Sequence, residues 1–185
     1  KALEWFRQVD STKPTEDATE AARLIRELEV DQDALRYGWT RPNREVPKQA
    51  RALLAQAQLM RQRGELDGAS RLLKDAIRLS PMFAAAHGEM GDILRALQDR
   101  PGAELAYLRA VAANAGDADL VAKLADFYLN ADRHTEAAWF FEQALQLRPD
   151  RLELHLRLAD AWRAAGNLPR ALHQVNRYLA EMGED

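Results

Sequence analysis

Histidine and carboxylate side chains are the groups of this 185-residue chain whose chemistry would serve catalysis or metal binding. No two of the four histidines, His87, His134, His155 and His173, stand at the i, i+3 or i, i+4 spacing that brings two ligands together on one helix. The chain has no cysteine, and it contains neither a G-x-x-x-x-G-K-[ST] phosphate loop nor a G-x-S-x-G nucleophile elbow. We therefore expect no catalytic residue, no metal and no cofactor, with the histidines packed or on the surface.

Three aspartates, Asp92, Asp126 and Asp160, recur at a fixed interval of 34 residues, and Gln58 stands one interval before them. This aspartate ladder would suit a basic or amide-rich peptide. The alternative is local pairing between side chains three residues apart on one helical face, worth only about 0.2–0.5 kcal/mol per exposed pair. The candidate pairs are Asp92–Arg95, Lys123–Asp126 and Arg157–Asp160. The residues leave both interpretations open.

The same interval runs through small and large apolar residues. Its four series are Ala57, Gly91, Ala125 and Ala159; Ala69, Ala103, Ala137 and Ala171; Leu73, Tyr107, Phe141 and Val175; and Ala76, Ala110, Ala144 and, by exception, Tyr178. A fixed period of about 20–50 residues is typical of a solenoid, in which each unit buries its apolar face against the next. We divide the chain into an N-terminal segment, 1–49, and four repeats, 50–83, 84–117, 118–151 and 152–185.

Each repeat is predicted to form two helices. In the third, apolar residues recur at three- and four-residue steps from Leu120 to Tyr128 and again from Ala137 to Leu147. Pro149 ends the second helix, because proline has no N–H to donate. The small residues would let helix axes approach to about 8–10 Å.

This pattern resembles the tetratricopeptide repeat, which pairs a small residue and an aromatic in its first helix with an alanine, an aromatic and a closing proline in its second. The matching residues include Ala125, Tyr128, Ala137, Phe141, Ala144 and Pro149 in the third repeat, and Ala159, Trp162, Ala171 and Val175 in the fourth. His87 and His155 depart from it, because the family has a large apolar residue there. The resemblance implies an all-α fold, a right-handed α-α superhelix (solenoid) of four 34-residue helix-turn-helix repeats with an N-terminal helical extension.

The resemblance also implies a concave groove, lined by the first helix of each repeat, that binds a protein or peptide partner. Its candidate residues are Arg51, Leu54, Gln58, Arg61, Glu89, Asp92, Arg95, Lys123, Asp126, Asn130, Arg157, Asp160 and Arg163. Some family members bind a C-terminal carboxylate through a clamp of Lys, Asn and Arg. The clamp positions here hold Leu54, Gln58, Glu89 and Asp119, and only Lys123 is basic, so we exclude that mode of recognition.

The composition argues against a nucleic-acid partner and against a membrane-spanning protein. The chain is 47% hydrophobic and 30% charged, with a net charge of −3 and no run of Lys or Arg, which argues against nucleic acid. No apolar run approaches the roughly 18 residues of a membrane span, and no signal peptide begins the chain. We expect no membrane insertion and a soluble protein of the cytoplasm or periplasm. The chain begins at Lys1, which suggests a piece of a longer protein.

The two ends of the repeat array offer further surfaces. Residues 1–49 are predicted to form a helical cap and linker over the first repeat; alternatively, Trp5, Phe6, Tyr37 and Trp39 bind a partner. At the other end, one helix carries an apolar edge made of Leu172, Val175, Tyr178, Leu179 and Met182. Solenoids cover such an edge with a polar capping helix. Either a cap lies outside this chain, or the edge docks another domain or a second subunit.

The leading functional hypothesis is a non-catalytic protein–protein interaction scaffold, bacterial in composition, in an envelope, secretion or polysaccharide-export assembly. One alternative is the regulatory portion of a larger enzyme, such as a transferase or hydroxylase. Another is a structural solenoid that assembles with itself.

Overall fold

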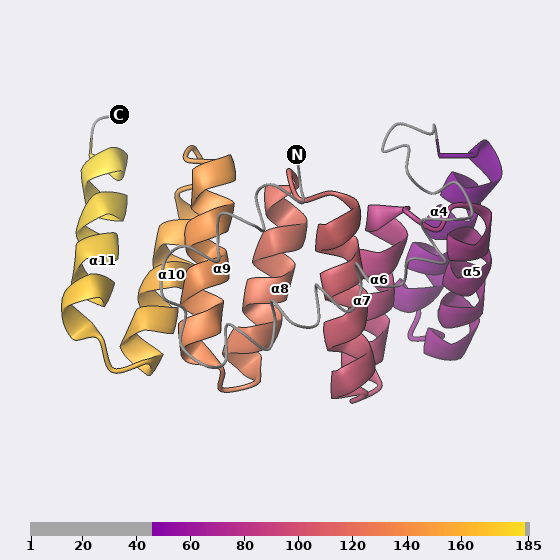
Figure 1. Ribbon diagram of the computed structural model, residues 1–185, viewed down its shortest axis with the longest axis horizontal. Helices are drawn as coiled ribbons and strands as arrows, with labels where there is room; N and C mark the ends of the chain where they lie inside the picture. The colour runs from indigo at the N-terminus through magenta and orange to yellow at the C-terminus, as the bar shows by residue number, and fades with distance from the viewer. Residues whose placement is uncertain (1–45, 184–185) are drawn as a thin grey trace. The chain divides into compact units, whose positions relative to one another are not determined.

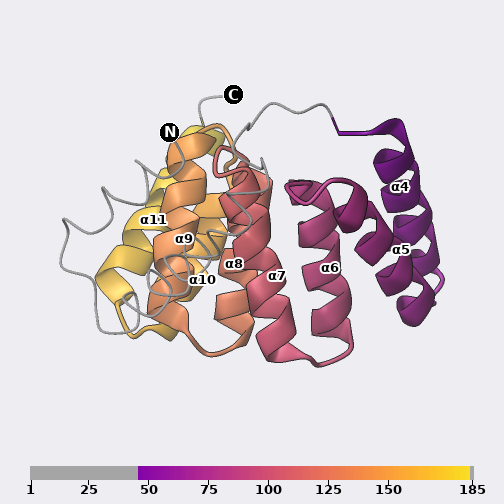
Figure 2. The same ribbon diagram turned by 45° about the vertical axis from the view of Figure 1, so that its right-hand side comes forward.

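The computed structural model describes residues 46–183, which form eight α-helices and no strand (Figure 1). The helices are α4 (Lys48–Gln62), α5 (Leu66–Leu79), α6 (Ala84–Ala96), α7 (Arg100–Ala113), α8 (Ala118–Asn130), α9 (His134–Leu147), α10 (Glu153–Ala164) and α11 (Leu168–Met182). Successive helices pack as pairs, α4 with α5, α6 with α7, α8 with α9 and α10 with α11 (Figure 2). The expected all-α helical repeat fold is confirmed. The predictions made for residues 1–45 lie outside the described residues.

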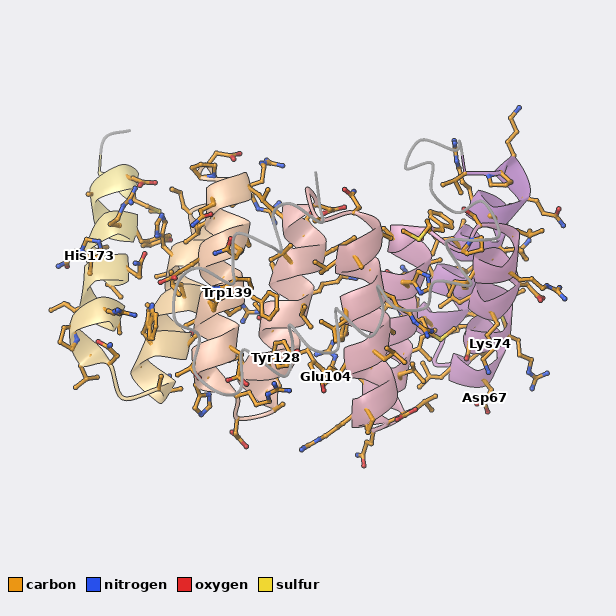
Figure 3. All side chains as sticks on the ribbon, viewed as in Figure 1. Asp67, Lys74, Glu104, Tyr128, Trp139 and His173 are labelled. Carbon is orange, nitrogen blue, oxygen red and sulfur yellow. The ribbon has the colours of Figure 1, made fainter. Side chains whose placement is uncertain are left out.

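The helices divide into two compact units between Asn114 and Ala115. In the unit of α4 to α7, Leu73, Ile93 and Tyr107 are almost fully buried. In the unit of α8 to α11, the ring of Phe140 stacks on Tyr128 with a centroid distance of 5.3 Å and meets Trp139 edge-on at 4.7 Å. Tyr128 and Trp139 are labelled in Figure 3. Each unit therefore has an aromatic and aliphatic core of its own.

Small residues of the 34-residue series lie where helices approach closely. Ala57, Gly91, Ala125 and Ala159 are all buried. Gly91 leaves no room for a side chain, because a Cβ atom added there would lie 2.6 Å from Cε1 of Tyr107. In the second repeat, the lack of space beside Tyr107 therefore explains why a small residue is needed at position 91.

The turns inside the four pairs share one backbone conformation. Gly64 and Gly166 have φ angles of 80° and 78°, and Gln98 and Asp132 occupy the equivalent places with φ angles of 62° and 60°. Glycine adopts this left-handed region freely, whereas a side chain there costs about 1–2 kcal/mol. The 34-residue interval therefore holds for the backbone conformation of the turns as well as for the buried residues.

Polar side chains and prolines fix several helix ends. Asp99 and Asp117 each accept a backbone N–H of the first turn, from Gly102 at 3.0 Å and from Asp119 at 3.0 Å. Helix α9 ends at Leu147, two residues before Pro149, as the sequence predicts.

Candidate partner-binding surface

The candidate groove residues lie on α4, α6, α8 and α10, the first helices of the four pairs. In the unit of α4 to α7, an ion pair joins two of these helices: Arg61 Nε donates to Glu89 Oε2 at 3.0 Å. Glu89 is only 8% exposed. The carboxylate of Glu89 is therefore held against α4, and the pair fixes the spacing of α4 and α6.

Asp92, the first member of the aspartate ladder, is directed toward α7. Its Oδ1 accepts a 2.6 Å hydrogen bond from the Tyr107 hydroxyl, and Arg95 lies 3.9 Å away, as the local-pairing interpretation predicted. Burial of the phenol, together with the hydrogen bond to Asp92, raises the pKa of Tyr107. This carboxylate therefore serves helix packing within the unit.

In the unit of α8 to α11, Asp126 bonds to a neighbouring first helix. Arg157 Nη2 on α10 lies 2.9 Å from Oδ1 and 3.0 Å from Oδ2 of Asp126 on α8. Asp160 instead accepts from Arg163 Nη2 at 3.2 Å. The predicted local pair between Arg157 and Asp160 is wrong, because the arginine side chain is long enough to reach the adjacent helix.

A second link between α8 and α10 was missed at the sequence level. Arg151 Nη2 lies 3.0 Å from Asp119 Oδ1, and Arg151 Nε also donates to Glu153. From the sequence, Asp119 was identified only as an acidic residue at a position of the carboxylate clamp, with no partner predicted for it. No spacing rule identified this link, because Arg151 precedes its helix.

A series of arginines was present in the sequence but not identified as a series. Arg61 and Arg95 are one interval apart, and Arg163 occupies the same place in the fourth repeat, with Leu129 in the third. Arg95 and Arg163 are exposed, and Arg61 is half-buried. The 34-residue spacing that revealed the aspartates would also have revealed these guanidinium groups.

The two histidines that depart from the family pattern are buried and hydrogen-bonded. His87 Nε2 lies 2.7 Å from the Pro81 carbonyl oxygen, and His155 Nδ1 lies 2.8 Å from Gln174 Oε1. Burial lowers the pKa of His87, despite the hydrogen bond with Pro81. His173 is exposed on α11 (Figure 3). Between residues 46 and 183, no three His, Asp or Glu side chains gather as metal ligands would.

The predicted apolar edge lies on α11. Leu172, Leu179 and Met182 are 61%, 58% and 54% exposed, whereas Val175 and Tyr178 are half-buried. Leu168, which the sequence argument did not include, is 65% exposed. It extends the edge by one turn toward the start of the helix. None of the helices in the described part of the chain has the length and apolar composition needed to cross a membrane.

Comparison with known proteins places these features in a family. Residues 128–185 match the family model described as tetratricopeptide repeat. The chain is also similar to cellulose synthase operon protein C of Xanthomonas axonopodis pv. citri (strain 306), with 36% identity over 90 residues. The matched stretch is 49% of this chain and 6% of that protein, so the chain covers only a small part of the relative.

Solved structures share the fold at low sequence identity. The crystal structure of MamA matches with a TM-score of 0.67 and 21% identity over 86% of this chain and 87% of MamA. PilF of Pseudomonas aeruginosa matches with 0.66 and 21% identity over 72% and 61% of the two chains. YrrB, a TPR protein with an unusual peptide-binding site, matches with 0.60 and 20% identity over 68% and 65%. The chain therefore carries tetratricopeptide repeat sequence over residues 128–185, and its 34-residue interval and paired helices share the fold of these solved structures.

Proposed function

We propose that this chain is a non-catalytic scaffold that binds a segment of a partner protein along the first helices of its repeats. The observation that carries the proposal is the set of ion pairs between neighbouring first helices, Arg61–Glu89 in one unit and Arg157–Asp126 in the other. Such pairs hold polar side chains in fixed positions on adjacent helices, and a preorganised surface loses less entropy on binding. The peptide-binding site named for YrrB supports the same use of the fold.

Site-specific photo-crosslinking tests this proposal. A benzophenone amino acid replaces Ala164, an exposed residue of α10, or Gln146, an exposed residue of α9 on a second helix of the same unit. We expect crosslinks to a protein partner in bacterial extract from position 164 and not from position 146. Equal capture at both positions, or capture only at 146, would contradict binding along the first helices.

We further propose that the partner belongs to a polysaccharide-synthesis assembly of the bacterial envelope. The 36% identity to a protein named for the cellulose synthase operon supports this assignment. The matching 90-residue stretch of this chain, placed into the Xanthomonas protein, should preserve cellulose production in that bacterium. A scrambled helical repeat of equal length is the control, and loss of cellulose with both inserts would argue against a shared role.

Self-association through the edge of α11 is a second candidate function, with a second copy of the chain as the occupant. Leu172 is 61% exposed, whereas the same place in the other repeats holds Ser70, Glu104 and Ala138. A larger apolar residue at this place favours a contact different from that between repeats. Sedimentation should show association that Leu172→Glu plus Leu179→Glu abolishes, and a monomer at high concentration would exclude it.

A further inference from the structure

We infer that the first-helix face of the α8–α11 unit binds an acidic segment of the partner, through the guanidinium groups of Arg157 and Arg163. This inference rests on the proposed function, because it names the chemistry of the segment that the same face binds. It reverses the expectation from the aspartate ladder, which suggested a basic segment.

The carboxylates of this face already have cationic partners. Both oxygens of Asp126 lie within 3.0 Å of Arg157 Nη2, and Oδ1 of Asp160 accepts from Arg163 Nη2 at 3.2 Å. A basic peptide would have to share either aspartate with the arginine that already binds it. Each arginine offsets the negative charge of its aspartate, which weakens the attraction of Lys or Arg side chains to this face.

The arginines, in contrast, keep donors available. A guanidinium group carries five N–H donors in a planar fork. The contacts of Arg157 and Arg163 involve only Nη2 of each, and their side chains are 52% and 67% exposed. The remaining N–H groups match the two oxygens of a carboxylate, which forms short, charge-assisted and often bidentate bonds with arginine.

The spacing of the arginines defines the segment further. They are six residues apart on α10, which separates their Cα atoms by about 9 Å along the axis and by about a third of a turn around it. Asp160 lies between them on the exposed arc, and Leu156, which is 37% exposed, lies one residue before Arg157. The face therefore fits a segment with two carboxylates and an apolar side chain beside one of them.

Fluorescence anisotropy of the full chain with labelled probe peptides tests the inference. The probes are a peptide of repeated Glu-Gly-Leu and the same peptide with Lys or with Gln in place of Glu. We expect the Glu peptide to bind at least about tenfold more tightly than the others, the scale of one hydrogen bond to a charged group. The net charge of −3 makes this a stringent result, since nonspecific attraction would favour the Lys peptide.

Matched variants locate the binding. Arg157→Gln and Arg163→Gln should each weaken binding of the Glu peptide by about tenfold. Arg78→Gln should leave it unchanged, because Arg78 makes the same i, i+3 pair with Asp75 as Arg163 makes with Asp160, but on the second helix α5. Arg163 pairs only with an exposed aspartate, so its variant should keep the wild-type circular dichroism spectrum even if Arg157→Gln does not.

Three outcomes would overturn the inference: tighter binding of the Lys peptide, no binding of any probe, or unchanged affinity in both arginine variants. Each of these leaves the crosslinking result at position 164 unaffected. If a partner is captured at position 164 but the chain shows no preference for the acidic peptide, the proposed scaffold function stands and the inference of an acidic segment is wrong.

Discussion

Two glutamates of α9 have opposite electrostatic environments. Burial alone would raise the pKa of Glu136, but hydrogen bonds from Arg133 Nε at 2.6 Å and Thr135 Oγ1 at 3.0 Å outweigh it and lower the pKa. At Glu142, burial dominates and raises the pKa, and the charge of Arg170 offsets this only in part. The difference follows from direct partners, because hydrogen bonds to the charged form stabilise it and desolvation does the reverse.

The first prediction is that Glu142→Gln raises the free energy of unfolding at pH 7. A carboxyl whose folded-state pKa lies above its unfolded value loses stability as the pH rises through the folded-state pKa. Urea titrations should therefore show the gain at neutral pH and its disappearance below the unfolded value of 4.5. Glu136→Gln is the opposite control: it should destabilise at pH 7, and its effect should decline as the pH falls through the lowered folded-state pKa.

The close contact of Gly91 with Tyr107 gives a second prediction at the same scale. Gly91→Ala should lower the free energy of unfolding by about 1–2 kcal/mol, because overpacking costs about 1–3 kcal/mol and exceeds the gain in helix propensity. The cost should fall in a Tyr107→Leu background, which copies the Ala57 and Leu73 combination of the first repeat. Chemical denaturation of the four proteins measures this, and an equal cost in both backgrounds would refute the clash.

Among the elements, the four turns inside the helix pairs impose one conformation on different residues. Only two of the four places, Gly64 and Gly166, have glycine. Gln98 and Asp132 accept a positive φ because the helices on both sides are fixed by packing.

A third prediction follows for these turns. Gln98→Gly and Asp132→Gly should each raise the free energy of unfolding by about 0.5–1 kcal/mol, since relief of the left-handed strain exceeds the added freedom of the unfolded chain. Gly166→Ala should lower it by a similar amount. Urea midpoints report the change, and a loss of stability in both glycine variants would show that the native side chains stabilise the turns.

At the scale of the whole molecule, stability in a repeat protein is approximately the sum of each repeat and its contacts with neighbours. Helix α8 buries seven residues, among them Leu124, Ala125 and Tyr128. Helix α11 buries only Ala171 among its 15 residues. The two helices of one unit therefore differ strongly in the apolar surface that holds them.

The fourth prediction is that α11 opens before the rest of its unit. Amide hydrogen exchange should show the fastest exchange in α11 and the slowest in α8, because local opening is easiest where few apolar contacts are lost. Self-association through the α11 edge would slow the amide exchange of α11 at high protein concentration. Exchange measured over a dilution series separates the two, and uniform protection at low concentration would contradict the prediction.

The helical pairs could be predicted from the residues alone, because a 34-residue interval requires each repeat to bury the same positions and to turn at the same places. The position of Pro149 and of the buried alanines was predicted correctly, since these depend on local backbone geometry and side-chain size. The partners of the charged side chains, in contrast, depend on how the helices pack. Arg157 pairs with Asp126 and not with Asp160, which is closer to it in the sequence, and Asp92 accepts a hydrogen bond from Tyr107. These side chains are long and flexible enough to reach a neighbouring helix, and the residue spacing along the chain does not specify the distance between the helices.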